Sequence, residues 1–229
     1  MCGKFTAMAS WRQVHTFSQP VDGGAGGAPD EVVTYRVAAP LPVIVLDPQT
    51  KQRRIVPMQW GFPHHTNPRR PQPIHARSET IDTTPAFADA FRDGQRGIVV
   101  MRTFNEGLEL PNGKTEQWTV DPGDGIPRGF AFLWRRFEFA ELPAPITACV
   151  MVTVPASELV AAITDRMPAI LEDADWAAWL GETPATPAEA KAVLKTMQGV
   201  NWRMEREAKP SKAPPRRKPP NTDPQGGLF

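Results

Sequence analysis

Short apolar runs, separated by proline and glycine, cover most of the chain. Runs rich in β-branched and aromatic residues, four to eight positions long and often alternating with polar ones, are typical of half-buried or buried strands. A strand or turn is expected over residues 2–6. Further strands are predicted at 32–37, 43–46, 54–60, 97–103, 117–120, 130–134, 147–153 and 200–206.

A smaller number of segments show helical spacing instead. In 85–92, Pro85 suits a first helical turn, Phe87 and Phe91 share one face, and Gly94 ends the segment. Further helices are predicted at 10–17, 156–163, 173–180 and 187–197. Many short strands mixed with short helices predict an α+β fold, with a curled, barrel-like, mainly antiparallel sheet and short flanking helices.

The prolines divide the chain into a folded part and a tail. The sequence has 229 residues and 26 prolines, and six of the prolines lie in the last twenty positions among lysine and arginine residues. Such a segment cannot bury enough apolar surface to order itself. We therefore predict one domain over 1–208 and a disordered basic tail over 209–229. Residues 21–30, rich in glycine, are predicted to be a mobile loop.

Composition narrows the function classes. The net charge is +1, so nucleic-acid binding would depend on local clusters of arginine and lysine. Two cysteines, Cys2 and Cys149, give no disulfide framework. No apolar run is long enough for a membrane span, and no signal peptide is evident. His15, His64 and His65 lack partners at metal-ligand spacing, so neither a metal nor another cofactor is expected. A cytoplasmic monomer is the expectation.

The chemistry most specific to this chain is at Cys2. Removal of Met1 would leave an N-terminal cysteine, whose α-amine and thiol have pKa values near ~8 and ~8.5. The amine can form a Schiff base with an aldehyde, and the thiolate can then close a thiazolidine ring. The amine can also act as base for its own thiol. On its own, a second-position cysteine is equally compatible with an arbitrary residue at a frayed terminus.

Three further segments carry candidate side chains. The run 74–80 holds His75, Arg77, Ser78 and Glu79, with His75, Arg77 and Glu79 on one face if it is extended. Glu106 follows a predicted buried strand, where desolvation would favour a general acid. Each has a plain structural alternative: a self-paired polar loop and an ordinary turn glutamate.

The third segment places aromatic residues beside cations. Trp60 is followed by Arg69 and Arg70, as in single-strand binders, although Trp60 is equally compatible with core packing. Asp165 and Arg166 are expected to form a structural ion pair.

Taken together and in this order, these segments resemble the SOS response-associated peptidase (SRAP) family over residues 2–206. The resemblance rests on the opening Met-Cys-Gly-Lys-Phe and on five later motifs. These are Val37-Ala38-Ala39-Pro40, Gln59-Trp60-Gly61-Phe62-Pro63, Ala76-Arg77-Ser78-Glu79-Thr80, Phe132-Leu133-Trp134 with Thr147-Ala148-Cys149, and Asp165-Arg166-Met167-Pro168-Ala169-Ile170-Leu171.

The resemblance implies a specific activity. Members sense abasic sites in single-stranded DNA and crosslink to the exposed sugar aldehyde through the N-terminal cysteine, as a thiazolidine that shields the lesion. The same cysteine is thought to remove its own leader, hence a peptidase, and lyase chemistry is possible. The catalytic positions carried over are Cys2, His75, Glu106 and Thr164. The positions expected to contact DNA are Lys4, Arg36, Trp60, Arg69, Arg70, Arg77, Ser78 and Arg166.

The sequence departs from the family at several of these positions. His75 stands where the family has Asn, Thr164 where it has His, and Arg36 where it has another Asn. The segment 101–106 also lacks the family's proline-containing turn. Three explanations stay open: His75 supplies the missing imidazole, crosslinking persists while its reversal is slowed, or the protein only binds single-stranded DNA.

The end of the chain suggests a partner. Gln225, Leu228 and Phe229 resemble the short peptide with which bacterial repair proteins dock on the replication sliding clamp. Such docking would place the protein at replication forks on the nucleoid. Met-Cys-Gly also opens class II glutamine amidotransferases, but their further motifs are not found here.

Overall fold

The computed structural model describes residues 4–7, 33–64 and 67–208, and the fold is mostly strand with a few short helices. The fold class predicted from the sequence is confirmed. The strands are β1 Lys4–Ala7, β2 Val33–Arg36, β3 Pro40–Leu46, β4 Arg53–Trp60, β5 Pro63–His64, β6 Asn67–Pro71, β7 His75–Arg77, β8 Arg96–Met101, β9 Phe104–Glu109, β10 Thr115–Asp121, β11 Arg128–Phe137, β12 Ile146–Pro155, β13 Arg166–Pro168, β14 Ile170–Leu171 and β15 Arg203–Arg206. The helices are α2 Ala88–Arg92, α3 Trp176–Leu180 and α4 Pro187–Ala192, with 3₁₀ turns η1 Ser78–Thr80, η2 Val160–Ala162 and η3 Asp173–Asp175.

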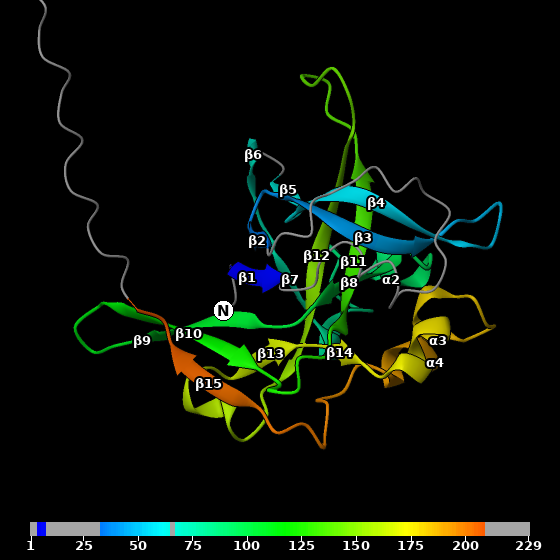
Figure 1. Cartoon of the computed structure of the whole chain (residues 1–229). Helices are drawn as coiled ribbons and strands as arrows, with labels where there is room; N and C mark the ends of the chain where they lie inside the picture. The colour runs from blue at the N-terminus through cyan, green and yellow to red at the C-terminus, as the bar shows by residue number, and fades with distance from the viewer. Residues whose placement is uncertain (1–3, 8–32, 65–66, 209–229) are drawn as a thin grey trace, which may run out of the picture.

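The larger sheet curls into a ring. Its order is β13-β12-β4-β3-β8-β11-β14, and β11 also pairs with β12, which closes the circuit β12-β4-β3-β8-β11. The ring is not a regular barrel, because β3 and β8 pair at Ile44 and Ile98 alone. Figure 1 shows α2, α3 and α4 gathered at one end, away from β9, β10 and β15.

The core fills the ring and the space under the helices. Strand β8 is buried at all six positions, and Phe130, Phe132 and Val150 are fully enclosed. Gly97 lies where β8 crosses β3, and a Cβ there would meet a Val43 methyl at 2.5 Å and the Ile44 carbonyl at 3.2 Å. Only glycine lets the two backbones approach so closely.

The smaller sheet has the order β15-β10-β9-β1-β2, with every pair antiparallel. β1 therefore lies between β2 and β9, paired with β2 from Lys4↔Arg36 to Ala7↔Val33 and with β9 at Lys4↔Asn105. This sheet carries the first described residues of the chain next to β9.

Several predicted elements differ in the structure. The predicted helix at 156–163 is only the 3₁₀ turn η2, because Pro155 ends β12 and polar residues open the segment. The helix predicted over 187–197 ends at Ala192, and Glu106, considered as a turn residue, lies inside β9. The short strands β13 and β14 were not predicted. The predictions for 10–17, 21–30 and 209–229 lie outside the described residues.

No helix in the described part of the chain is long and apolar enough to cross a membrane.

Candidate functional site

Glu106 lies on the buried face of the smaller sheet. Its side chain is 2% exposed. It lies two residues after the fully buried Phe104, so the two side chains point to the same face of β9. Its partner across the β9–β10 pair is Trp118, so the indole and the carboxyl group share one face of the sheet. A carboxyl group this deep in the protein has lost most of its water, as the sequence reasoning expected.

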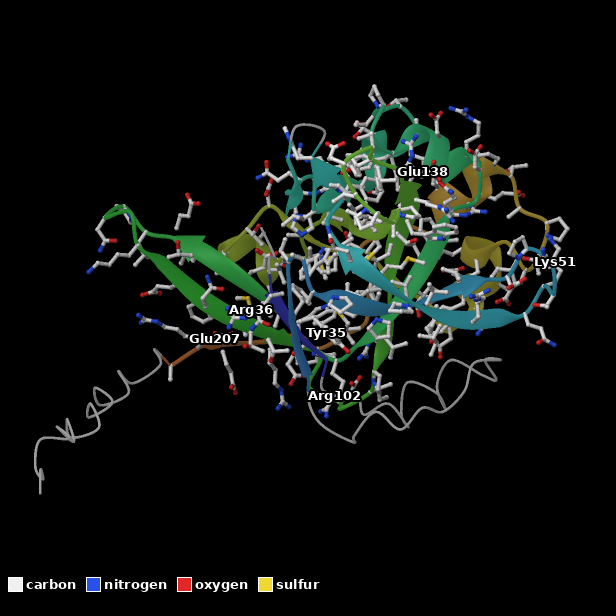
Figure 2. All side chains as sticks on the ribbon, turned by 90° about the horizontal axis from the view of Figure 1, so that it is seen from above. Tyr35, Arg36, Lys51, Arg102, Glu138 and Glu207 are labelled. Atoms are coloured by element: carbon white, nitrogen blue, oxygen red, sulfur yellow. The ribbon has the colours of Figure 1, made fainter. Side chains whose placement is uncertain are left out.

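The row beside Glu106 continues across β1 and β2. Asn105 is aligned with Lys4, and Lys4 with Arg36. Arg36 is exposed, and no ion pair of the described residues includes it. Figure 2 shows Arg36 and Glu207 along the smaller sheet, whereas Lys51 and Glu138 lie over the larger one. Cys2 lies outside the described residues.

Asn105 is a site residue that sequence reasoning missed. Its side-chain amide donates to the Thr119 hydroxyl at 2.9 Å and to the Glu207 carboxylate. Asn105 is buried, and its Oδ1 has no hydrogen-bond partner among the described residues. The sequence gives only a weak signal for Asn105: it is a polar residue inside the segment that forms β9.

His75 lies in the second group of candidate residues, on the larger sheet. It begins β7, which runs parallel to β12 with His75 aligned to Met151. Its ring meets the Trp60 ring edge-on, with centroids 6.5 Å apart. Trp60 is fully buried, and its indole N–H donates to the Ile74 carbonyl at 3.2 Å. Trp60 is thus a core residue that supports His75, and this burial is incompatible with the base stacking expected from the sequence.

The residues after His75 are tied to β13. Arg77 is exposed and Ser78 is buried. Both carboxylate oxygens of Glu79 accept from Arg166, at 2.5 and 2.8 Å, and Arg166 also donates to the Thr153 carbonyl at 2.6 Å. The Arg166 guanidinium, acting mainly through its hydrogen bond to the carboxylate, lowers the pKa of Glu79 to about 2.

Arg166 therefore pairs with Glu79, and the expected pair with Asp165 is not formed: Asp165 is exposed and belongs to no described ion pair. Because its guanidinium already donates to Glu79 and to the Thr153 carbonyl, Arg166 would have to give up these partners to bind a DNA phosphate. Thr164 lies in the loop before β13, and its hydroxyl accepts from the Arg166 backbone N–H at 3.5 Å.

The candidate residues thus form two groups. Lys4, Arg36 and Glu106 belong to the smaller sheet, and His75, Arg77, Ser78, Thr164 and Arg166 to the larger one. Arg69 and Arg70 lie on β6, which pairs with β5 rather than with either sheet. Gln225, Leu228 and Phe229 lie outside the described residues.

Neither Cys149 nor any described cluster of His, Cys, Asp or Glu side chains adds a second reactive or metal-binding site. Cys149 is fully buried, and that burial raises the pKa of its thiol, which makes it a poor nucleophile. The described residues contain no cluster of three or more His, Cys, Asp or Glu side chains that could hold a metal ion.

The chain is similar to several known proteins along most of its length. The abasic site processing proteins YoqW and YobE of Bacillus subtilis (strain 168) are 24% and 25% identical over 211 and 210 residues. Each match covers 85% of this chain, and 87% and 88% of the relative. A crystal structure of a protein from Bacteroides thetaiotaomicron matches with a TM-score of 0.73 and 18% identity, covering 90% of this chain and 91% of that one. One from Bordetella bronchiseptica matches with a TM-score of 0.71 and 19% identity, covering 90% and 100%.

These structures share the fold. The model of the family described as SOS response associated peptidase (SRAP) matches residues 1–208. Because that match spans nearly the whole chain, the protein belongs to the SRAP family.

Proposed function

We propose that this protein processes abasic sites in single-stranded DNA by forming a covalent crosslink through Cys2. Family membership over residues 1–208 supports a role at abasic sites, since relatives bear the name abasic site processing protein. The observation that carries the proposal is the position of β1: the strand that directly follows Cys2 in sequence pairs with β9 beside the buried Glu106.

Covalent geometry supports the same chemistry. Two peptide units span at most about 7 Å, so an N-terminal Cys2 would act close to the Lys4–Asn105 pair. Pairing of β1 with strands on both sides holds Lys4 and reduces the entropy lost in bringing the terminus to a substrate. A nucleophile tethered in this way needs no cofactor.

The crosslink proceeds in two bond-forming steps. After removal of Met1, the Cys2 amine attacks C1′ of the ring-opened sugar, and the carbinolamine loses water to give an imine. The thiolate then attacks the imine carbon, and the nitrogen takes a proton to complete the thiazolidine. One C–N bond and one C–S bond form, and one water leaves. Glu106 is the proposed acid that protonates the departing hydroxyl, because its burial favours the neutral carboxyl group.

His75 is the proposed replacement for the family's histidine. Thr164 occupies that family position, and a hydroxyl, unlike an imidazole, does not change its protonation state near neutral pH. His75 is supported from behind by the buried Trp60 ring, so its orientation is restricted. We infer that His75 takes the thiol proton. A slower reversal of the crosslink is the accompanying expectation, since Thr164 lacks the imidazole that the family has at that position.

The experiment incubates the purified full chain with a single-stranded oligonucleotide that carries one abasic site. A band that resists denaturation should form with the wild type and with Cys149→Ala, but not with Cys2→Ala. The two variants are matched, because the chain has only these two cysteines. Intact mass spectrometry should show loss of Met1 and a gain equal to the oligonucleotide minus one water.

Two further outcomes separate the alternatives. His75→Ala and Glu106→Gln should slow the crosslink while leaving non-covalent binding intact. A wild type that binds single-stranded DNA with strong salt dependence but never crosslinks would favour the binding-only relative.

The exposed arginines are the proposed phosphate contacts. Arg36 and Arg77 are exposed, and none of the ion pairs within the described residues uses them. Arginine presents a planar fork that suits a phosphate. Replacing either with glutamine should weaken binding to all sequences alike and reduce the salt slope by about one.

The C-terminal peptide is a separate proposal. Leu228 and Phe229 would fill an apolar pocket of the sliding clamp and Gln225 would bind its rim, which would bring a monomeric, cytoplasmic protein to replication forks on the nucleoid. Deleting 225–229 should abolish capture by immobilised clamp and leave crosslinking unchanged. Capture that survives the deletion would refute this proposal alone.

A further inference from the structure

A small polar cavity opens on the face of the smaller sheet opposite Glu106. Its volume is about 160 Å³, and its walls come from β10, β15, the end of β8 and the loop after β10. Four charged side chains line it: Arg102, Arg203, Asp121 and Glu205. Figure 2 shows Arg102 on the side of the molecule that carries the smaller sheet.

These four charges do not neutralise one another. Asp121 and Arg203 are direct cross-strand partners, yet no described ion pair within 4.0 Å joins any of the four residues. The Arg102 Nε is buried and has no hydrogen-bond partner among the residues described. Oppositely charged residues that face each other on neighbouring strands, as Asp121 and Arg203 do, ordinarily form an ion pair. The Oδ1 of Asp121 accepts from the Gly123 backbone N–H at 2.7 Å, and the four side chains line the cavity without pairing with one another.

Two glycines shape the walls. A Cβ on Gly123 would lie 2.9 Å from Arg203 Nε, and one on Gly125 would lie 3.5 Å from an Arg102 Nη. The two guanidinium groups therefore lie against bare backbone; a side chain at Gly123 would displace Arg203, whereas one at Gly125 would make only ordinary contact with Arg102. Both glycines have a positive φ, +77° and +72°.

The lining decides the class of ligand. A phosphate would meet two carboxylates as well as two guanidiniums, so the charges would cancel its attraction. A neutral group with adjacent acceptors on one edge and adjacent donors on another can use a guanidinium and a carboxylate at the same time. Guanine is such a group: its O6 and N7 accept from a guanidinium, and its N1 and N2 hydrogens donate to a carboxylate.

We propose that this cavity holds a guanine base of the bound DNA strand, on the opposite face of the smaller sheet from Glu106. The inference rests on the proposed function only for the source of the base. Thr119, which lines the cavity, accepts from Asn105, and Asn105 precedes Glu106 on β9. A guanine in the cavity would thus contact residues fixed by the same strands that carry the crosslinking site.

The test measures non-covalent affinity of the full chain for undamaged single strands by fluorescence anisotropy. Short oligothymidylates carry one central guanine, adenine or cytosine, at one fixed salt concentration. The wild type should bind the guanine strand at least about fivefold more tightly than the other strands. Fivefold is the lower end of the discrimination expected from one bidentate contact to a base. Arg203→Gln should reduce that ratio to near one. Arg203 is exposed, so this variant is expected to fold.

A pair of glycine variants supplies the matched control. Gly123→Ala should lose the guanine preference, because its Cβ displaces Arg203. Gly113→Ala places the same strain on a residue with φ +73°, but its Cβ meets nothing within 4 Å, so the preference should remain.

Equal weakening of all strands by Arg203→Gln, with a smaller salt slope, would mean a phosphate contact and overturn the inference. If free dGMP competes for the protein as effectively as the guanine-containing strand does, the guanine need not belong to a DNA strand, and that part of the inference would be overturned. Because undamaged strands cannot crosslink, loss of guanine preference and loss of crosslinking are separate results.

Discussion

The bidentate pair between Glu79 and Arg166 links the η1 turn, which follows His75 and Arg77, to β13. We expect Glu79→Gln to destabilise the protein at neutral pH, and the loss to disappear in acid. The pKa of Glu79 falls from 4.5 to about 2, chiefly through the hydrogen bond from Arg166. A group with a lowered folded-state pKa contributes stability above its unfolded pKa, and that contribution is lost as the pH falls toward the folded value.

The magnitude follows from the pKa and the exposure. The difference 4.5 − 2 gives about 2.5 pKa units, or nominally about 3.4 kcal/mol. The Glu79 side chain is 48% exposed, however, so solvent screening reduces this to about 1 kcal/mol. Arg166 is only 12% exposed and would lose its charged partner, which adds roughly a further 0.5–1 kcal/mol. The expected destabilisation at pH 7 is therefore about 1–2 kcal/mol.

Urea denaturation at several pH values measures it. The difference in unfolding free energy between wild type and Glu79→Gln should be full at pH 7 and shrink between about pH 4.5 and pH 2. Glu138→Gln is the matched control: its pair with Arg136 is 3.5 Å long and its side chain is 78% exposed, so its expected cost is below about 0.5 kcal/mol. Equal losses in the two variants, or a Glu79→Gln loss that does not change with pH, would refute the reasoning.

Three other predictions follow from single residues. Gly97→Ala should lower stability by about 1–3 kcal/mol in urea denaturation, because its Cβ meets Val43 at 2.5 Å across two fixed strands. Asn105→Ala should cost about 1–3 kcal/mol in the same assay, because the buried amide bonds both Thr119 and Glu207. Cys149 should resist alkylation by iodoacetamide in the native protein and react once it is unfolded, as read by mass spectrometry, since burial raises the pKa of its thiol.

The sequence predicted secondary structure best where a pattern of apolar residues extends over a whole strand or helix. Strands β3, β4, β11 and β12 and the helix at Trp176 were all predicted, because β-branched runs and the tryptophan stripe leave few alternatives. The 156–163 segment misled, because its apolar residues have helical spacing, whereas the strand that follows, Arg166–Pro168, is set by its tertiary pairing with β12. Local pattern cannot foresee pairing with β12.

The candidate site shows the same division. Glu106 was identified from its position after a buried strand, but that it pairs with Trp118 on a shared face depends on the register of β9 and β10. The unpaired charges around Arg102 come from segments a hundred residues apart, 102 and 203, and no sequence spacing brings them together. Trp60 was ambiguous, because an aromatic residue beside cations is equally common in cores and in binding faces; its full burial decides for the core.

The two sheets hold their candidate residues in different ways, and two of the departures from the family pattern, His75 and Thr164, belong to the larger sheet and the loop before β13. The smaller sheet carries β1 and the buried Glu106, and both are positioned by backbone pairing that any side chain permits. The larger sheet supplies His75 and Thr164 from the start of β7 and the loop before β13, where side-chain contacts with Trp60 and Arg166 hold the geometry. Under the proposed mechanism, we expect a change of residue type at these positions to alter proton transfer without displacing β1. If this reasoning is right, Thr164→His should change how fast a crosslink reverses and leave its formation nearly unchanged, whereas any substitution that breaks the β1–β9 pair should abolish formation itself.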